Sequence, residues 1–167
     1  VSGSCPILRR TALEQLSGTV GYVLDPWYFT YGEDVDVMIR LHLLGWRVRF
    51  IPDLRAWHIR SASTAVASRF YQKPDATQVR HFRNRLATIF KTYPKRVLWT
   101  RAPALAFAEL ATPAYLLLRR PRSVLNWVRA WKEIWVERAR LRHDRRRIQG
   151  AAAPEFIARL GRLLAQI

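Results

Sequence analysis

Three carboxylates lie within four residues of one another in the stretch WYFTYGEDVDVMIRLHLLGW. Glu33, Asp34 and Asp36 follow a run of aromatic residues and precede an apolar run. A carboxylate at the mouth of a pocket can take a proton from a substrate hydroxyl, which is general base catalysis. Acidic residues are also common at a helix start for a structural reason, because they complement the helix dipole. The spacing alone leaves both interpretations open.

This acidic cluster lies in a part of the chain that is close to neutral. The whole chain carries a formal net charge of +17, yet residues 1–60 hold 7 Lys or Arg and 6 Asp or Glu. Residues 61–167 hold 22 basic and 6 acidic side chains. We expect this basic part to face an anionic partner such as phosphate, lipid headgroups or nucleic acid. The apolar fraction of 50% excludes a wholly disordered chain.

The cysteine count and the first residues set further bounds. Cys5 is the single cysteine, so the chain cannot form an internal disulfide or a Cys-x-x-Cys zinc site. The opening VSGSCPILRR has neither Met nor the apolar core of a signal peptide. We therefore expect a piece of a longer protein.

Predicted helices and strands alternate in the first part of the chain, and these elements must position the acids. Thr11 and Glu14 have the spacing of a capping box, which predicts a helix start after a short strand. A second helix should begin at Glu33 or Asp34 and run to residue 44, with Gly45 as its C-terminal signal. Residues 46–52 alternate apolar and charged side chains, as a half-buried strand does, and 54–59 form a second extended run. A third helix should cover 76–93, before Pro94.

The remainder of the chain has helical and amphipathic patterns. Residues 102–118 are mostly apolar but contain Glu109, Pro103 and Pro113, which favours a helical hairpin or an interfacial segment over a membrane span. Residues 121–147 should form a long basic helix, followed by another amphipathic helix at 154–167. A stripe of three tryptophans on the long helix is typical of an interfacial helix, although packing on its own domain is the alternative. Its members are Trp127, Trp131 and Trp135.

The segment YFTYGEDVDVMIRLHLLGWRVRFIPDLRAWHIRSAS resembles the C-terminal half of the catalytic domain of family 2 glycosyltransferases, in particular rhamnosyltransferase-like enzymes of cell-surface polysaccharide synthesis. SGSCPILRRTAL and RHFRNRLATIFKTYP extend the resemblance over residues 2–100. Ser61 departs from the pattern, which has Gly at that place. The matching positions are Tyr28, Phe29, Tyr31, Glu33, Asp34, Asp36, Arg40, Gly45, Pro52, His58 and Ser63.

The resemblance implies an α/β fold. We expect a partial GT-A (Rossmann-like) sandwich that lacks its N-terminal nucleotide-binding half, followed by an α-helical C-terminal region. Residues 1–95 would form the acceptor-side half of the glycosyltransferase domain. Residues 96–167 would form a helical, basic, amphipathic region that associates with membranes.

The resemblance also implies roles for the acidic and aromatic residues. Transfer would invert the sugar, with Asp34 as general base and Glu33 shaping the acceptor site. Asp36 would cap the helix and pair with Arg40 four residues later, which is a structural role. An aromatic set, Trp27, Tyr28 and Tyr31, would stack on the faces of acceptor sugars, with core packing as the alternative.

A divalent metal, Mg²⁺ or Mn²⁺, is the cofactor that the resemblance implies. It would neutralise the leaving diphosphate, with His58 as one ligand. Ser63 and Gly3 would contact donor phosphate. Asp34-Val35-Asp36 fits the pattern of the Asp-x-Asp metal motif, but the resemblance places it at the position of the family's general base.

The expected partners are a nucleotide-sugar donor, a glycan or polyprenyl-linked acceptor, and an anionic membrane surface. The enzyme would then be cytoplasmic and peripheral on the inner face of the cell membrane, with residues 120–149 contacting lipid. Two alternatives remain. One is a nucleic-acid-binding protein, although the sequence contains no nucleic-acid recognition motif. The other is a non-catalytic remnant that acts as a membrane-associated or scaffold domain.

Overall fold

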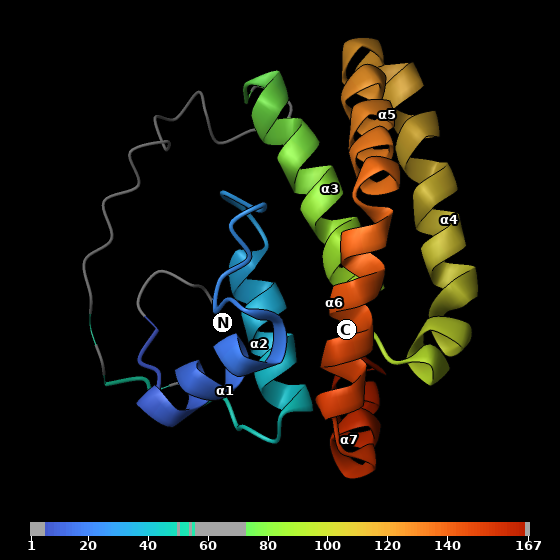
Figure 1. Cartoon of the computed structure of the whole chain (residues 1–167). Helices are drawn as coiled ribbons and strands as arrows, with labels where there is room; N and C mark the ends of the chain where they lie inside the picture. The colour runs from blue at the N-terminus through green and yellow to red at the C-terminus, as the bar shows by residue number, and fades with distance from the viewer. Residues whose placement is uncertain (1–5, 50, 54, 56–72, 166–167) are drawn as a thin grey trace.

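A computed structural model describes residues 6–49, 51–53, 55 and 73–165, and these residues fold into helices and connecting loops (Figure 1). Prolines mark several of the boundaries: Pro121 and Pro154 open helices, and Pro94 separates two. In chain order the helices are α1 (Arg10–Val20), α2 (Glu33–Leu43), α3 (Asp75–Thr92), α4 (Lys95–Arg119), α5 (Pro121–Val136), α6 (Arg138–Ala151) and α7 (Pro154–Ala165).

The predicted α/β sandwich is wrong for the part of the chain that the structure describes, which contains no β-strand. Residues 46–49, in the predicted strand at 46–52, are not in regular structure. A strand is stable only when its backbone groups pair with a neighbouring strand, and no described segment offers such a partner. The predicted extended run at 54–59 lies outside the described residues, apart from Arg55.

Helices α1 and α2 pack together through small and branched apolar side chains. Ala12 and Leu16 of α1 contact Val37 and Leu41 of α2 in one buried cluster. The predicted capping box is wrong: α1 begins at Arg10, and no side chain caps it. The predicted end of α2 is confirmed, because Gly45 follows it with a left-handed φ of 91°.

Helix α3 lies at the centre of the molecule, between α2 and the rod formed by α5 and α6 (Figure 1). Val79 and Phe82 of α3 form a buried cluster with Leu116 of α4 and Ala130 of α5. The predicted long basic helix is divided at Glu137 into α5 and α6, which continue in nearly one direction. Side chains from α2, α3 and α6 can therefore meet in a shared interior.

Helix α4 forms the outer edge of the molecule (Figure 1). It runs without a break from Lys95 to Arg119 through Pro103 and Pro113, so the hairpin predicted within 102–118 is wrong. Each of these prolines removes a backbone donor but does not end the helix. The turn comes instead at Arg120, between α4 and α5. None of the described helices is both long and apolar enough to cross a membrane.

The tryptophan stripe on α5 is only partly used for packing. Trp127 is half-buried against the cluster of α3 and α4 residues, and its ring lies edge-on to Trp131 at 6.1 Å between ring centroids. Trp135 is 67% exposed, with the Arg138 guanidinium above its ring. One end of the stripe therefore belongs to the core, and the other faces outward.

Candidate functional site

The loop before α2 has an unusual backbone conformation. Phe29 and Tyr31 have positive φ values of 61° and 66°, and Gly32 follows with 86°. The left-handed region suits glycine but costs a residue with a β-carbon roughly 1 kcal/mol or more. Such strain is found mainly where surrounding contacts fix the chain for a function. This loop leads directly into Glu33 and Asp34.

A single buried amide holds this loop. Asn84, on α3, is 1% exposed, and its Nδ2 donates to the carbonyl oxygens of Tyr28 at 3.0 Å, Thr30 at 2.8 Å and Tyr31 at 2.7 Å. Two amide hydrogens are thus shared among three acceptors. The three carbonyls converge on this amide because the left-handed residues turn the backbone toward α3. Asn84 therefore fixes the path of the chain into the acidic cluster.

Arg83 provides a second attachment beside the first. Its guanidinium donates to the carbonyl oxygen of Trp27 at 2.5 Å and lies 4.1 Å from the centroid of the Trp27 ring. It also pairs with Glu133 of α5 at 2.7 Å. One arginine thereby connects the loop, α3 and α5. One signal in the sequence indicated Arg83 and Asn84, which is the family resemblance of the segment RHFRNRLATIFKTYP.

Glu33 and Asp34 lie at the start of α2 and are both half-buried. Asp34 Oδ1 accepts a hydrogen bond from the backbone N–H of Val35 at 2.8 Å. The Oε2 atom of Glu33 is buried without a hydrogen-bond partner among the described residues. A buried carboxylate oxygen that lacks a donor is costly. This oxygen is therefore suited to accept a hydrogen bond from a bound hydroxyl.

Asp36 does not cap α2, contrary to expectation. The residue before the helix is Gly32, and no side chain caps the helix start. Asp36 is fully buried, and its Oδ2 pairs with Arg40 Nε at 2.9 Å. Its Oδ1 lies 3.2 Å from Lys91 Nζ of α3. The third acid of the cluster thus belongs to the core, whereas Glu33 and Asp34 remain partly accessible.

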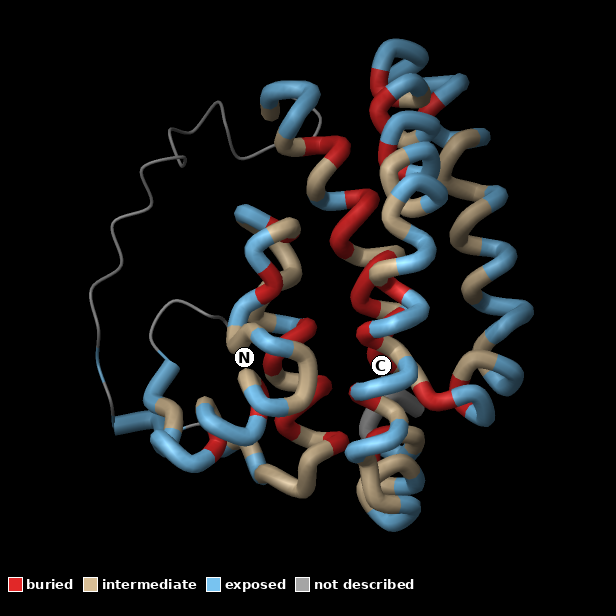
Figure 2. Tube along the Cα trace, in the orientation of Figure 1, coloured by how far each residue is buried: buried red, intermediate tan, exposed pale blue. Residues whose placement is uncertain are grey.

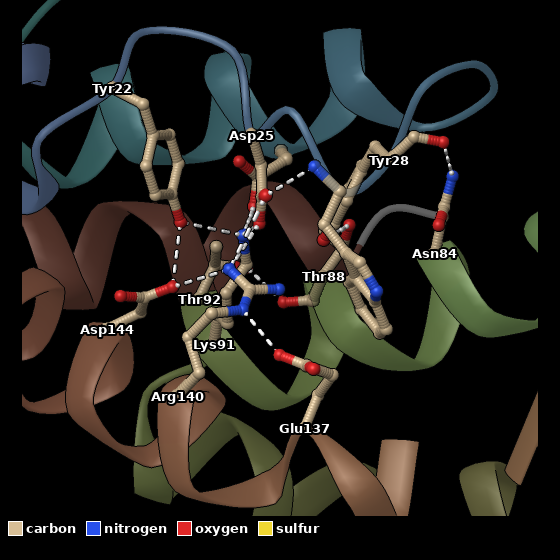
Figure 3. A network of polar contacts seen from close by, with 12 residues as sticks. Tyr22, Asp25, Tyr28, Asn84, Thr88, Lys91, Thr92, Glu137, Arg140 and Asp144 are labelled. Carbon is tan, nitrogen blue, oxygen red and sulfur yellow. Dashed lines mark hydrogen bonds and ion pairs between the residues drawn. The ribbon is translucent and has the colours of Figure 1, made fainter. Parts of the chain in front are cut away.

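A network of charged and polar side chains connects the loop after α1 with α3 and α6 (Figure 3). Lys91 Nζ is 2.7 Å from Asp25 Oδ2, and both side chains are fully buried. Arg140 of α6 pairs with Asp25 and Asp144, at 3.2 Å in each case. Tyr22 donates to Asp144 at 2.8 Å. The network joins the loop after α1 to α3 and α6, and it connects to α2 through the Lys91–Asp36 pair.

These contacts change the protonation of their members. Burial alone would raise the pKa of Asp25, but the adjacent Lys91 and Arg140 cations outweigh it and lower that pKa below its usual value. Burial and the neighbouring carboxylates Asp25 and Asp144 raise the pKa of the Tyr22 hydroxyl, so it stays a hydrogen-bond donor. Sequence reasoning missed Asp25, Lys91 and Arg140, because nothing local indicates pairs 66 and 115 residues apart.

The aromatic residues separate into buried and exposed groups. Tyr28 is fully buried, and its hydroxyl lies 2.8 Å from Thr88 Oγ1, so the predicted stacking on acceptor sugars is not available to it. Trp27 is half-buried, and the guanidinium groups of Arg83 and Arg140 lie 4.1 Å and 4.9 Å from the centroid of its ring.

Tyr31 and Phe29 form the accessible aromatic group. Tyr31 is half-buried and accepts a hydrogen bond from Lys73 Nζ at 2.8 Å. Phe29 is 77% exposed, with the Arg80 guanidinium over its ring. The accessible aromatic surface near the acids therefore consists of Tyr31 and Phe29.

The residues predicted to bind the metal and the phosphate of the sugar donor lie outside the part of the chain that the structure describes. His58, Ser63 and Gly3 lie in ranges whose structure is not described. Among the described residues, no group of three or more His, Cys, Asp or Glu side chains is placed to hold a metal ion. The buried carboxylates of Asp25 and Asp36 contact cationic side chains instead. These two carboxylates therefore do not fit the implied Mg²⁺ or Mn²⁺.

Replacement of Asn84 by Ala should impair both the fold and the site. Three carbonyls of the loop would lose their donor, at a cost of roughly 1–3 kcal/mol in the free energy of unfolding. If the chain carries out the sugar transfer that the resemblance implies, turnover should also fall by more than tenfold, because the path into Asp34 is no longer fixed. Urea unfolding and a sugar-transfer assay measure the two effects. Asn126→Ala is the matched control, since Asn126 is equally buried but bonds to Asp75. Equal loss of turnover in both variants would contradict the positioning role.

The chain matches one protein-family model and is similar to two known proteins. The model of the family described as "Glycosyl transferase family group 2" matches residues 1–136. An N-acetylglucosaminyl-diphospho-decaprenol L-rhamnosyltransferase of Mycobacterium tuberculosis, from strains CDC 1551 / Oshkosh and ATCC 25618 / H37Rv, is 39% identical over 64 residues. The matched segment covers 38% of this chain and 19% of each relative's length. No solved structure matches the chain.

Proposed function

Because this chain belongs to glycosyl transferase family group 2, we propose that it provides the acceptor side of an inverting sugar transfer in which Asp34 is the general base. The family match confirms the resemblance found in the sequence. The single observation that supports this role is the placement of the acids: Glu33 and Asp34 stay partly accessible at the end of a fixed loop, while Asp36 is buried in ion pairs.

The proposed reaction is a single displacement. An oxygen of the acceptor hydroxyl forms a bond to the anomeric carbon, and the bond from that carbon to the nucleoside diphosphate breaks. The diphosphate leaves with the bonding electrons, and the hydroxyl proton moves to the Asp34 carboxylate. A carboxylate is a weak base toward an alcohol, so this transfer is expected late, when the new bond has begun to form.

Other residues of the site would bind and orient the acceptor. Glu33 Oε2, which lacks a partner among the described residues, would accept a hydrogen bond from a second acceptor hydroxyl. Tyr31 and the exposed ring of Phe29 would provide apolar contact with a sugar face. Asn84 and Arg83 would hold the loop that carries both rings. Positioning of this kind can account for several kcal/mol of a reaction barrier.

We propose a lipid-linked diphosphate sugar as the acceptor class. The name of the mycobacterial relatives states that they act on N-acetylglucosaminyl-diphospho-decaprenol. A segment that makes up 38% of this chain is similar to part of their sequence. Residues 1–95 would then form the acceptor-side unit, and residues 96–167 a basic region on the cytoplasmic face of the membrane. The nucleotide-sugar donor would be bound mainly by other residues.

An assay of transfer tests this function directly. The full gene product that contains these residues would be incubated with a panel of radiolabelled nucleotide sugars and a short-chain polyprenyl diphosphate-linked N-acetylglucosamine. We expect label to move from one donor to the organic phase that contains the lipid. Release of free sugar alone, with no labelled lipid or glycan for any donor, would contradict the proposal.

A further inference from the structure

Helix α4 exposes an apolar face along nearly its whole length. Trp99 is 80% exposed, Phe107 74%, Leu110 73% and Leu118 84%. At 100° per residue, these side chains and their small neighbours fall within an arc of about 120°. The face, called the α4 face below, consists of Trp99, Pro103, Ala106, Phe107, Leu110, Ala114, Leu117 and Leu118.

The opposite side of α4 carries its internal polar contact. Glu109 pairs with Arg85 of α3, and Val97 and Leu116 are the buried apolar residues of the helix. Figure 2 shows the result, because α4 is tan and pale blue along most of its length while α3 contains long red stretches. A helix at a protein–water boundary normally turns its polar side outward. This arrangement is reversed, and an exposed apolar stripe of this kind indicates a binding surface.

The charges next to the α4 face identify the kind of partner. No Asp, Glu, Lys or Arg belongs to the face, which spans about 28 Å at 1.5 Å per residue. Exposed basic residues lie at both of its ends: Lys95 and Arg96 before it, and Arg119, Arg120 and Arg122 after it. A helix that crosses a bilayer has only one end in each leaflet, and α4 does not meet the criteria for a span. Basic ends on an apolar stripe instead suit a helix that lies flat among anionic headgroups.

We infer that the α4 face docks on an anionic lipid bilayer, with its apolar side chains in the acyl boundary and its terminal Lys and Arg at the headgroups. The sequence predicted membrane association over residues 96–167, with lipid contact at residues 120–149, and this arrangement centres the contact on α4. On α5, Trp127 is part of the core and Asn126 is buried, so less of that helix is available. The inference is independent of the proposed sugar transfer.

Vesicle sedimentation tests this inference with the 167-residue chain. The probes are vesicles of phosphatidylcholine alone and of phosphatidylcholine mixed with phosphatidylglycerol. The test variant is Phe107→Gln/Leu110→Gln/Leu118→Gln on α4. The matched control is Leu125→Gln/Val128→Gln/Val136→Gln, which replaces three exposed apolar residues of α5. Because all six side chains are exposed, thermal unfolding should show that both variants remain folded.

We expect the wild-type chain to bind anionic vesicles at least tenfold better than neutral ones, and salt should weaken this binding. The α4 variant should lose about a hundredfold in partitioning, and the α5 control less than threefold. Equal losses in the two variants would overturn the assignment to α4. Absence of vesicle binding, together with a dimer in sedimentation equilibrium that the α4 variant abolishes, would show that a second copy covers the face instead.

Discussion

Asp34→Asn should reduce the rate of sugar transfer by a factor of about 10² to 10⁴, the usual contribution of a positioned general base. The amide cannot take the proton of the acceptor hydroxyl, although it keeps the size and most hydrogen-bonding positions of the carboxylate. Because Asp34 is only half-buried, the variant should fold normally. We expect kcat to fall while the KM for the donor changes little, since the base acts in the transition state.

Two further substitutions make the Asp34 result specific. Asp53→Asn is the matched control, because Asp53 is an exposed acid outside the site and should retain full activity. Glu33→Gln should raise the KM for the acceptor more than it lowers kcat, as expected of a residue that binds a hydroxyl. If Asp34→Asn kept most of the wild-type turnover, Asp34 would not be the base. If Glu33→Gln alone abolished turnover, the two roles would have to be exchanged.

Lys91→Met should cause the largest loss of stability among single substitutions in the charge network. It would leave Asp25 and Asp36 buried without their shared cation, and broken buried pairs typically cost 3–5 kcal/mol. Urea unfolding at neutral pH measures this loss in the free energy of unfolding. Lys95→Met is the control, since Lys95 is exposed and should change stability by about 0.5 kcal/mol or less.

The pH dependence of the Lys91 effect identifies its cause. Asp25 has a lowered pKa in the folded state, so its contribution to stability is present above its ordinary pKa of 3.8 and is lost as the pH falls through the lower folded value. The difference between wild type and Lys91→Met should therefore shrink as the pH falls below 3.8. A difference that stayed constant into acid would indicate lost packing of the Lys91 stem rather than the loss of its ion pairs.

Local signals in the sequence were sufficient for several helices. The predicted helix at 76–93 is observed as Asp75–Thr92, and its end follows from Pro94. The helix after the acids ends as expected before Gly45. In both cases one residue with restricted or permissive backbone geometry sets the boundary. Such signals act over a few residues and can be recognised without knowledge of the fold.

Properties that depend on distant residues could not be predicted in the same way. The alternation at 46–52 matches a strand, but a strand also needs partners, and no described segment provides them. Tyr28 and Phe29 are adjacent aromatic residues, yet Tyr28 is buried against Thr88 and Phe29 is exposed. Only contacts with α3 distinguish them. Pro103 and Pro113 also misled the prediction, because neither ends α4.

The stereochemistry of transfer distinguishes a base from a nucleophile at Asp34. If Asp34 acts as a base in a single displacement, the new glycosidic bond must have the anomeric configuration opposite to that of the donor. Proton NMR of the isolated product, compared with the donor, measures this configuration from the anomeric coupling. We expect inversion. Retention would require two displacements, with a nucleophile that attacks the sugar first, and would contradict the role assigned to Asp34.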